Sequence, residues 1–266
     1  MEINFEDKSV VVIGGTSGIN LGIAKKFSES GARLAVASRS QDKVDEAIEI
    51  LSKNKHKAIG LTGDVRDYPT VDNIMKDFNS KLGDFDVLIS GAAGNFPAPA
   101  NGISSNGFKA VVDIDLVGTF HVMKSAYPFL KKPGASVINI SAPQAYVPLE
   151  LQIHVCAAKS GVDMVTKVLA LEWGKDGIRV NSISPGPIAE TEGMKRLAPT
   201  EEILNATVDS VPLKRIGTKS DIASTAMFLS SNYASYISGT VIPVDGGWSL
   251  GGVSALTTEM KKIFQL

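Results

Sequence analysis

The chain carries the sequence Ile13-Gly14-Gly15-Thr16-Ser17-Gly18-Ile19-Asn20-Leu21-Gly22 directly after a short apolar run at residues 10–13. A strand that leads into glycines and then into a helix is an arrangement that binds dinucleotides, because backbone amides can approach the pyrophosphate there and the helix N-terminus favours its charge. A tight strand-to-helix turn would also use glycine. Four glycines in nine residues favour the nucleotide site. We therefore predict cofactor contacts at Gly15, Thr16, Ser17, Gly18 and Ile19.

Short apolar runs rich in β-branched residues recur along the chain, with helix-patterned segments between them. They lie at residues 10–13, 34–37, 58–61, 87–89, 137–140, 180–183 and 241–244. Each run is continuous rather than alternating, which is typical of strands buried on both faces. This alternation predicts a single doubly wound α/β domain over residues 1–266, with a seven-stranded parallel sheet and helices on both faces. Residues 187–212 lack a role in the sheet, and we interpret them as a substrate loop or lid.

Composition and charge exclude several classes of protein. Hydrophobic residues make up 44% of the chain, and 27 basic residues face 28 acidic ones, so the basic surplus typical of nucleic-acid binding is absent. The single cysteine, Cys156, excludes an intramolecular disulfide and a multi-cysteine metal site, and it fits a reducing compartment. The first residues contain no apolar stretch long enough for a signal peptide, so we expect none, and no segment approaches the roughly 18 apolar residues of a membrane span. We expect a cytoplasmic protein without nucleic-acid, membrane or metal partners.

The end of the second apolar run bears on the choice of cofactor. An acid at this place would bind the adenosine ribose hydroxyls and repel a 2′-phosphate, whereas an arginine beside a hydroxyl accommodates that phosphate. The chain has Ala37-Ser38-Arg39-Ser40 and no acid. A solvated arginine at a strand exit is the alternative. We predict NADPH, with Ser38 and Arg39 at its phosphate, and with Asp64-Val65 at the adenine ring.

These motifs, taken in order, resemble the short-chain dehydrogenase/reductase family over nearly the whole chain. The further matching pieces are Ala92-Ala93-Gly94, Asn139-Ile140-Ser141, Lys159, Arg179-Val180-Asn181, Pro185-Gly186 and Asp245-Gly246-Gly247. The resemblance implies a Rossmann fold and a nicotinamide cofactor. It also implies that the cofactor is contacted by Ala92, Ala93, Gly94, Lys159, Pro185, Gly186 and Ile188.

The chain departs from this family at two catalytic positions. Members usually use a Ser, a Tyr and a Lys for proton transfer, with the Tyr and Lys at i, i+4 on one helix. Here Val155 stands four residues before Lys159, and Ala142 stands seventeen before it. Neither side chain can give or take a proton. An ordinary alcohol dehydrogenase mechanism is therefore not expected.

One branch of the family lacks that Tyr, namely the peroxisomal-type 2,4-dienoyl-CoA reductases and their bacterial relatives, and the chain is similar to it at residues 91–96, 113–120, 172–174 and 185–194. The branch uses NADPH to reduce a conjugated dienoyl thioester to a 3-enoyl thioester. The resemblance implies that Asp115 and Lys159 are catalytic and hold the water that supplies the proton. Lys159 would also hold the nicotinamide ribose.

Four further residues are candidates for contact with an acyl-CoA substrate. Asn95 and Phe96 follow the fourth strand, and ligands of open α/β sheets lie beyond the strand carboxyl ends. Tyr146 stands two residues after Gln144, the position of a catalytic Tyr in the mitochondrial type of the branch. His154 is placed near the thioester, with a structural histidine as the alternative.

The leading hypothesis is an NADPH-dependent 2,4-dienoyl-CoA reductase-like enzyme, accessory to unsaturated fatty acid β-oxidation. The alternatives are a reductase of another oxo or enoyl compound, or a catalytically inactive nucleotide-binding protein, which would not need the acid at Asp115. Residues 239–250 resemble a C-terminal strand that packs in family tetramers, so we expect a homotetramer. Residues 263–266 do not fit the S-K-L peroxisomal address, which favours a bacterial cytoplasm over a peroxisome.

Overall fold

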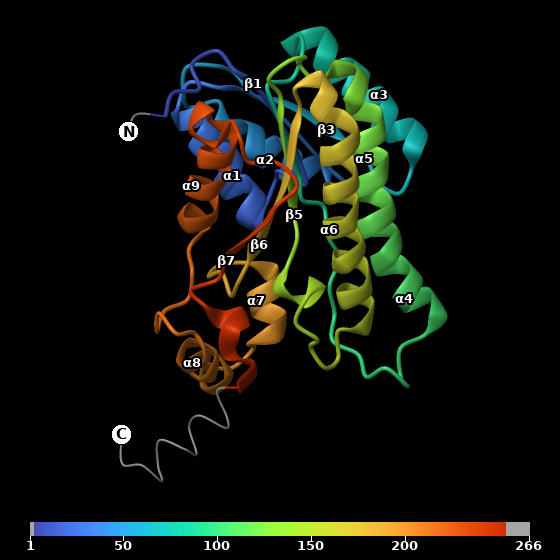
Figure 1. Ribbon diagram of the computed structural model, residues 1–266, viewed down its shortest axis with the longest axis vertical. Helices are drawn as coiled ribbons and strands as arrows, with labels where there is room; N and C mark the ends of the chain where they lie inside the picture. Colours follow the sequence, from blue (N-terminus) through green and yellow to red (C-terminus); the bar gives the residue numbers. More distant parts are fainter. Residues whose placement is uncertain (1–2, 254–266) are drawn as a thin grey trace.

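Seven parallel strands form one sheet in the order β3-β2-β1-β4-β5-β6-β7 (Figure 1). The computed structural model describes residues 3–253. The strands are β1 (Ser9–Ile13), β2 (Arg33–Ser38), β3 (Ile59–Thr62), β4 (Val87–Ser90), β5 (Ser136–Ile140), β6 (Arg179–Pro185) and β7 (Val241–Val244). Each coincides with an apolar run of the sequence to within two residues at either end. The predicted seven-stranded parallel sheet is confirmed.

Helices cover both faces of the sheet, as predicted (Figure 1). One face carries α1 (Gly18–Glu29), α2 (Gln41–Leu51) and α9 (Lys219–Ser230). The other carries α3 (Tyr68–Leu82), α4 (Ser105–Val112), α5 (Gly118–Ala126) and α6 (Ile153–Trp173). Short 3₁₀ turns lie at Tyr127–Phe129, Pro143–Ala145, Gly174–Asp176, Asn232–Ala234 and Trp248–Val253.

The sheet separates two hydrophobic cores, since successive side chains of a strand point to opposite faces. Val10 and Val12 pack with the α1 side, and Val11 and Ile13 pack with the α3 side. All four are buried, which explains why β1 is apolar without alternation. The edge strands β3 and β7 are only partly buried. The expectation of burial on both faces is therefore wrong for these two strands, because each has a neighbour on one side only.

The segment interpreted as a loop, residues 187–212, contains two short helices, α7 (Glu192–Leu197) and α8 (Glu201–Ser210). Each begins at a threonine whose hydroxyl accepts a hydrogen bond from the first turn, Thr191 from the Met194 amide at 3.2 Å and Thr200 from the Ile203 amide at 3.3 Å. Neither helix has a buried residue. Without an apolar stripe, these helices gave no periodic signal in the sequence.

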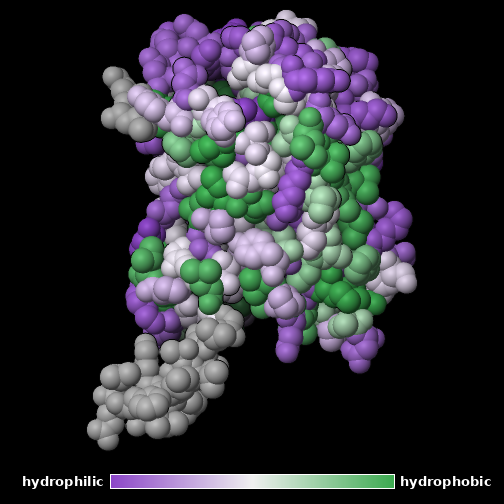
Figure 2. Space-filling view, viewed as in Figure 1, coloured by the Kyte–Doolittle hydropathy of each residue, from purple (hydrophilic) through white to green (hydrophobic). Residues whose placement is uncertain are grey.

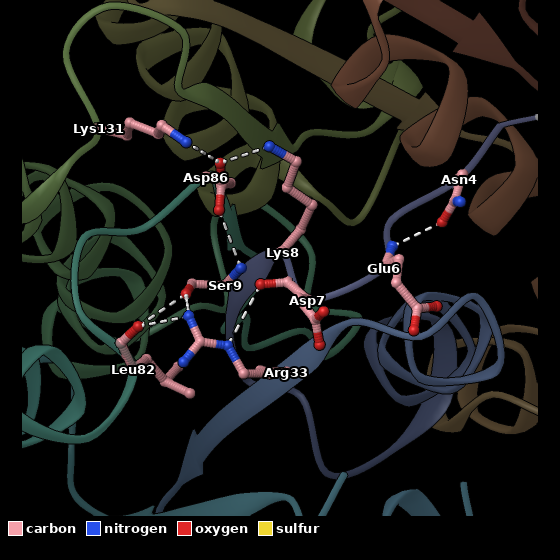
Figure 3. A network of polar contacts seen from close by, with 9 residues as sticks. All are labelled: Asn4, Glu6, Asp7, Lys8, Ser9, Arg33, Leu82, Asp86 and Lys131. Carbon is pink, nitrogen blue, oxygen red and sulfur yellow. Dashed lines mark hydrogen bonds and ion pairs between the residues drawn. The ribbon is translucent and has the colours of Figure 1, made fainter. Parts of the chain in front are cut away.

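A polar network ties together the starts of the strands (Figure 3). The Arg33 guanidinium donates to Ser9 Oγ at 2.7 Å and to the Leu82 carbonyl at 2.8 Å. Asp86 accepts from the Ser9 amide at 3.0 Å and from two lysine ammonium groups, Lys8 and Lys131, at 3.1 Å each. Burial tends to raise the pKa of Asp86, but the Ser9 amide and the two ammonium groups outweigh it and lower the pKa. Every group of this network finds its partner within the chain.

Within residues 3–253, none of the helices combines the length and the apolar character that crossing a bilayer requires. The comparison with the peroxisomal address concerns residues 263–266, which lie outside the described residues.

Candidate functional site

The glycine-rich turn between β1 and α1 packs closely against the neighbouring backbone. Gly14 has φ +77°, and a Cβ built there would lie 2.9 Å from the backbone nitrogen of Ala92 on the neighbouring β4 side. A Cβ on Gly15 would lie 2.8 Å from the Val12 carbonyl oxygen. Ser17, at the N-cap of α1, forms no side-chain capping bond, so the first-turn amides of α1 lack that acceptor. These amides fit an anion.

A cavity of about 270 Å³ extends from this turn toward the end of β2. Of the predicted cofactor residues, it is lined by Thr16, Ser17, Ser38, Arg39, Val65, Ala92 and Ala93. Ser40 and Lys43 lie beside Arg39 at the same end. Ser38 Oγ is buried without a hydrogen-bond partner, and Arg39 forms no hydrogen bond or ion pair with residues 3–253. Two cations and two hydroxyls thus surround one end of the cavity, which fits a phosphate.

Asp64 is placed differently from Val65. Its carboxylate pairs with Arg66, whose Nε donates to Oδ1 at 3.0 Å, and the Arg66 guanidinium lowers the pKa of Asp64. Val65 and Gly63 line the cavity, while Asp64 is not among its lining residues. Of the two residues predicted at the adenine ring, Val65 therefore lines the cavity and Asp64 does not.

A second cavity, of about 600 Å³, lies beyond the carboxyl ends of β4, β5 and β6, and we call it the chamber. It shares Ser17, Asn20, Gly91 and Ala93 with the first cavity, so the two form one continuous site. The predicted residues lining it are Ser17, Ile19, Ala93, Gly94, Asn95, Asp115, Lys159, Pro185, Gly186 and Ile188. Gly15 and Gly18 shape the turn and line neither cavity. The site crosses the β1–β4 switch point, where open parallel sheets bind ligands.

Asp115 and Lys159 meet at the wall of the chamber. Asp115 lies in a π-helical turn, Asp113–Val117, inserted between α4 and α5, and such turns are frequent at functional sites. Its Oδ1 accepts from the Gly94 amide at 2.7 Å, and its Oδ2 forms an ion pair with Lys159 Nζ at 3.2 Å. Lys159 also donates to the Ile140 carbonyl at 3.0 Å. The side chains are 1% and 7% exposed, so the pair is shielded from solvent.

The ion pair leaves hydrogen-bonding capacity toward the chamber. Asp115 Oδ2 receives no hydrogen bond from residues 3–253, since its contact with Lys159 is ionic. An ammonium group has three N–H donors, and one of those of Lys159 is used by the Ile140 carbonyl. A water or a ribose hydroxyl on the chamber side can therefore hydrogen-bond to both side chains.

Apolar side chains stand at the two positions where the family usually has its catalytic Ser and Tyr. Ala142 and Val155 both line the chamber. Val155 is 3% exposed and packs against Val111 and Ala158. Among residues 3–253 that line the chamber, Asp115 is thus the acidic residue that contacts Lys159.

The predicted substrate residues are brought to the chamber unequally. Asn95 lines it, and its carbonyl accepts from Arg196 of α7 at 2.7 Å. Phe96 and His154 stack with ring centroids 4.5 Å apart, and His154 is fully buried with neither ring nitrogen hydrogen-bonded in the described chain. Tyr146 is half-exposed, and its hydroxyl lies 3.0 Å from Ser184 Oγ. Phe96, His154 and Tyr146 do not line the chamber.

Several site residues were not predicted. Asn20 donates to the Gly91 carbonyl at 2.7 Å and lines both cavities, although it lies within the glycine-rich stretch. Lys43 lies four residues after Arg39, a spacing that could have marked it. Gln144 is buried at the chamber wall. Met194 and Trp248 also line it, and their residue types carry no specific signal.

The fold and this continuous site define a dinucleotide-binding oxidoreductase domain. A family model described as enoyl-(acyl carrier protein) reductase matches residues 14–249. The chain belongs to the short-chain dehydrogenase/reductase family, whose fold implies a nicotinamide dinucleotide cofactor.

The predicted resemblance to the 2,4-dienoyl-CoA reductases is confirmed. The chain is 43% identical to the peroxisomal, (3E)-enoyl-CoA-producing 2,4-dienoyl-CoA reductase of Arabidopsis thaliana, over 95% of this chain and 88% of that one. It is 38% identical to a probable (2E)-enoyl-CoA-producing 2,4-dienoyl-CoA reductase of Bacillus subtilis, over 91% and 96%. A crystal structure of a short chain dehydrogenase from Bacillus anthracis superposes with a TM-score of 0.84 at 37% identity, covering 91% of this chain and 96% of that one.

Proposed function

We propose that this chain is an NADPH-dependent reductase of 2,4-dienoyl-CoA or closely similar enoyl thioesters, serving unsaturated fatty acid β-oxidation. The observation that carries the proposal is the buried Asp115–Lys159 pair, in a chamber where Ala142 and Val155 replace the family's usual proton donors. A carbonyl reductase needs a donor at the carbonyl oxygen. A dienoyl reductase needs a proton at carbon, which a water held by an acid and an ammonium can supply.

NADPH is supported by the end of β2. Ser38 and Arg39, with Ser40 and Lys43, provide charge-assisted donors for a 2′-phosphate, and none of residues 3–253 that line this cavity carries a carboxylate to repel it. The glycine turn and the α1 amides would hold the pyrophosphate, and Lys159 the nicotinamide ribose. When bound, the nicotinamide supplies a hydride.

The chain's own residues handle the proton. The Gly94 amide and the Ile140 carbonyl orient Asp115 and Lys159, respectively, so that both groups face the chamber. As the hydride adds at the far end of the conjugated system, negative charge develops toward the thioester oxygen. The water held by Asp115 and Lys159 then gives a proton to the carbon next to the thioester carbonyl, which leaves a 3-enoyl thioester. The resulting hydroxide takes a proton from the Lys159 ammonium, which recovers one from solvent. Lys159 stabilises the charge that develops during this step.

The chamber suits an acyl chain. Leu149, Met194, Leu197 and Trp248 line it together with Ala142 and Val155. An apolar cavity with a few convergent polar groups is typical of a small-molecule site. Since residues of α7 form part of the wall, we propose that residues 187–212 act as the substrate lid.

We also propose a homotetramer, in a bacterial cytoplasm rather than a peroxisome. Met164, Val168 and Leu171 follow i, i+4, i+7 on the outer face of α6, and Leu171 is 84% exposed. Figure 2 shows hydrophobic residues gathered over α6 and its neighbours. Exposed apolar surface of this kind marks protein contacts. Leu171→Glu should lower the mass found by analytical ultracentrifugation, and an unchanged mass would remove α6 from the interface.

A substrate panel tests the proposed activity. Loss of NADPH absorbance is followed with 2,4-hexadienoyl-CoA, with 2-hexenoyl-CoA and with the acyl carrier protein thioester that the family model's description names. We expect consumption with the dienoyl thioester and little with the mono-enoyl ones. Preference for a mono-enoyl thioester would support the alternative enoyl reductase, and NADPH binding without turnover of any thioester would support an inactive protein.

A further inference from the structure

Residues 91–94, which we call the partition, form a short segment between the two cavities of the site. The partition follows β4 and belongs to no helix or strand. Gly91 and Ala93 line both cavities, Ala92 lines the first, and Gly94 lines the chamber. The backbone amides and carbonyls of Ala92 and Ala93 form no hydrogen bond with residues 3–253. The position of the partition therefore depends on the hydrogen bonds at its two ends.

The first end of the partition is fixed to the β1–α1 unit that carries the glycine-rich turn. The Gly91 amide donates to the Ile13 carbonyl at 3.1 Å. The Gly91 carbonyl accepts a hydrogen bond at 2.7 Å from Nδ2 of Asn20, which lies in the first turn of α1. A Cβ built on Gly91 would lie 2.3–2.6 Å from atoms of the Asn20 carboxamide. The contact therefore requires glycine at position 91.

The second end of the partition is fixed to Asp115. The Gly94 amide donates to Asp115 Oδ1 at 2.7 Å, and Asp115 Oδ2 pairs with Lys159 Nζ at 3.2 Å. A shift of the partition would move the Gly94 amide, and with it the carboxylate that this amide orients. Asn20 is thus connected to the ion pair by hydrogen bonds and by the covalent chain of the partition.

Neither helix formation nor packing accounts for Asn20. Asparagine is a weak helix former, and near a helix start its side chain commonly bonds to its own backbone. The Asn20 side chain is buried, but its carboxamide reaches across to Gly91 instead. Its Oδ1 has no hydrogen-bond partner in residues 3–253. Since a buried oxygen without a partner lowers stability, the bond to Gly91 points to a role other than stability.

We propose that Asn20 is a positioning residue, which holds the partition so that the Gly94 amide places the Asp115 carboxylate beside Lys159. This inference rests on the proposed reduction, in which Asp115 orients the water that gives the proton. The first turn of α1 then has two tasks, since its amides face the pyrophosphate site and Asn20 places the acid. Asn20 acts through Gly91 and Gly94 rather than on the substrate.

The variant Asn20→Ala removes the donor to the Gly91 carbonyl. Its kcat at saturating NADPH should fall about tenfold, as expected for the loss of one hydrogen bond that supports the transition state. In a double-mutant cycle, adding Asn20→Ala to Asp115→Asn should change kcat by less than about twofold, because the group that Asn20 positions is already lost. A further tenfold fall in the double variant would overturn the proposal, and so would an effect confined to the KM for NADPH.

The variant Gly91→Ala disrupts the same contact from the other side, in case Asn20→Ala fails to fold. The added methyl group would displace the Asn20 carboxamide, so kcat should fall by about the same factor. Combining the two changes should give a rate no lower than that of either alone, since the shorter side chain at position 20 leaves room for the methyl group. A combined loss equal to the product of the two would contradict a shared route.

Hydrogen–deuterium exchange at the Gly94 amide provides a readout that does not depend on turnover. Mass spectrometry with fragmentation of the peptide can follow this amide in the enzyme without cofactor or substrate. Asn20→Ala should speed its exchange about tenfold, because the bond to Asp115 opens more often. Ser28→Ala is the matched control, since Ser28 also lies on α1 and donates to a distant carbonyl, that of Leu51, at 2.8 Å. The control should keep wild-type kcat and wild-type exchange at Gly94.

Wild-type exchange at Gly94 in both Asn20→Ala and Gly91→Ala would overturn the proposal. Faster exchange in Ser28→Ala as well would also overturn it, since the effect would then belong to α1 as a whole. If the wild type turns over no thioester, the proposed function fails. Exchange at Gly94 still decides in that case whether Asn20 positions the partition.

Discussion

The two ends of the same sheet treat their polar groups in opposite ways. Where the strands begin, Ser9, Arg33 and Asp86 satisfy one another and the neighbouring backbone (Figure 3). Where the strands end, polar atoms are buried without hydrogen-bond partners from residues 3–253. They are Asn20 Oδ1, Ser38 Oγ, Asn95 Oδ1, Asp115 Oδ2 and Ser141 Oγ. Since buried polar groups are normally paired, the unpaired end is the one shaped for partners from outside the chain. The comparison teaches that the side of the sheet where the strands begin serves stability, and the side where they end serves ligand binding.

The largest effect is expected at Asp115. Asp115→Ala should reduce kcat by about 10²–10⁴-fold, because the water at Lys159 loses its acceptor, while NADPH affinity stays nearly intact. Asp115→Asn keeps the side-chain size and can keep the hydrogen bond from the Gly94 amide, so it serves as a second variant in case Asp115→Ala fails to fold. Steady-state kinetics and NADPH titration by fluorescence measure the two quantities. A wild-type rate in both variants would contradict the claim that the unpaired groups where the strands end serve the reaction.

A smaller effect is expected at the phosphate end. Arg39→Ala should raise the KM for NADPH about 10- to 100-fold, as expected for the loss of a charged hydrogen bond. The KM for NADH should hardly change, since NADH lacks the 2′-phosphate. Lys43→Ala should also raise the KM for NADPH, which would show that Lys43, a residue not predicted from the sequence, contacts the phosphate. Equal effects on both cofactors would place Arg39 elsewhere than at this phosphate.

The smallest effect on activity is expected at Asp86, on the side of the sheet where the strands begin. Asp86→Asn should lower the free energy of unfolding by about 1–3 kcal/mol at pH 7, with kcat unchanged. The folded pKa of Asp86 is lowered from 3.8, so its stabilisation is present above pH 3.8 and is lost as the pH falls through the folded value. Urea denaturation at several pH values measures this. A difference between wild type and variant that persists at very low pH would contradict the assignment.

The strands and the glycine turn could be predicted from the sequence because their signals are local. β-branched runs such as residues 10–13 are buried on both faces, and Gly14 is required by its close approach to Ala92. The helices α7 and α8 bury no residue and so leave no stripe.

The closeness of Ser141 and Ser184 could not be predicted, because register rather than spacing brings them together. Ser141 and Ser184 are far apart in sequence and become neighbours only through the pairing of β5 with β6. The Phe96–His154 stack likewise joins a loop to the start of α6. The family resemblance identified Asp115 and Lys159 as candidates, but their contact depends on the π-helical turn at Asp113–Val117.

The most direct test of the central claim is the reduction of 2,4-hexadienoyl-CoA by NADPH in D₂O, with the product read by NMR and the rate compared between wild type and Asp115→Asn. If Asp115 and Lys159 deliver a solvent proton to carbon, the product should be a 3-enoyl thioester with one deuteron next to the thioester carbonyl. It should form at least about a hundredfold more slowly in the variant. Equal rates, or deuterium at the far carbon instead, would contradict the account.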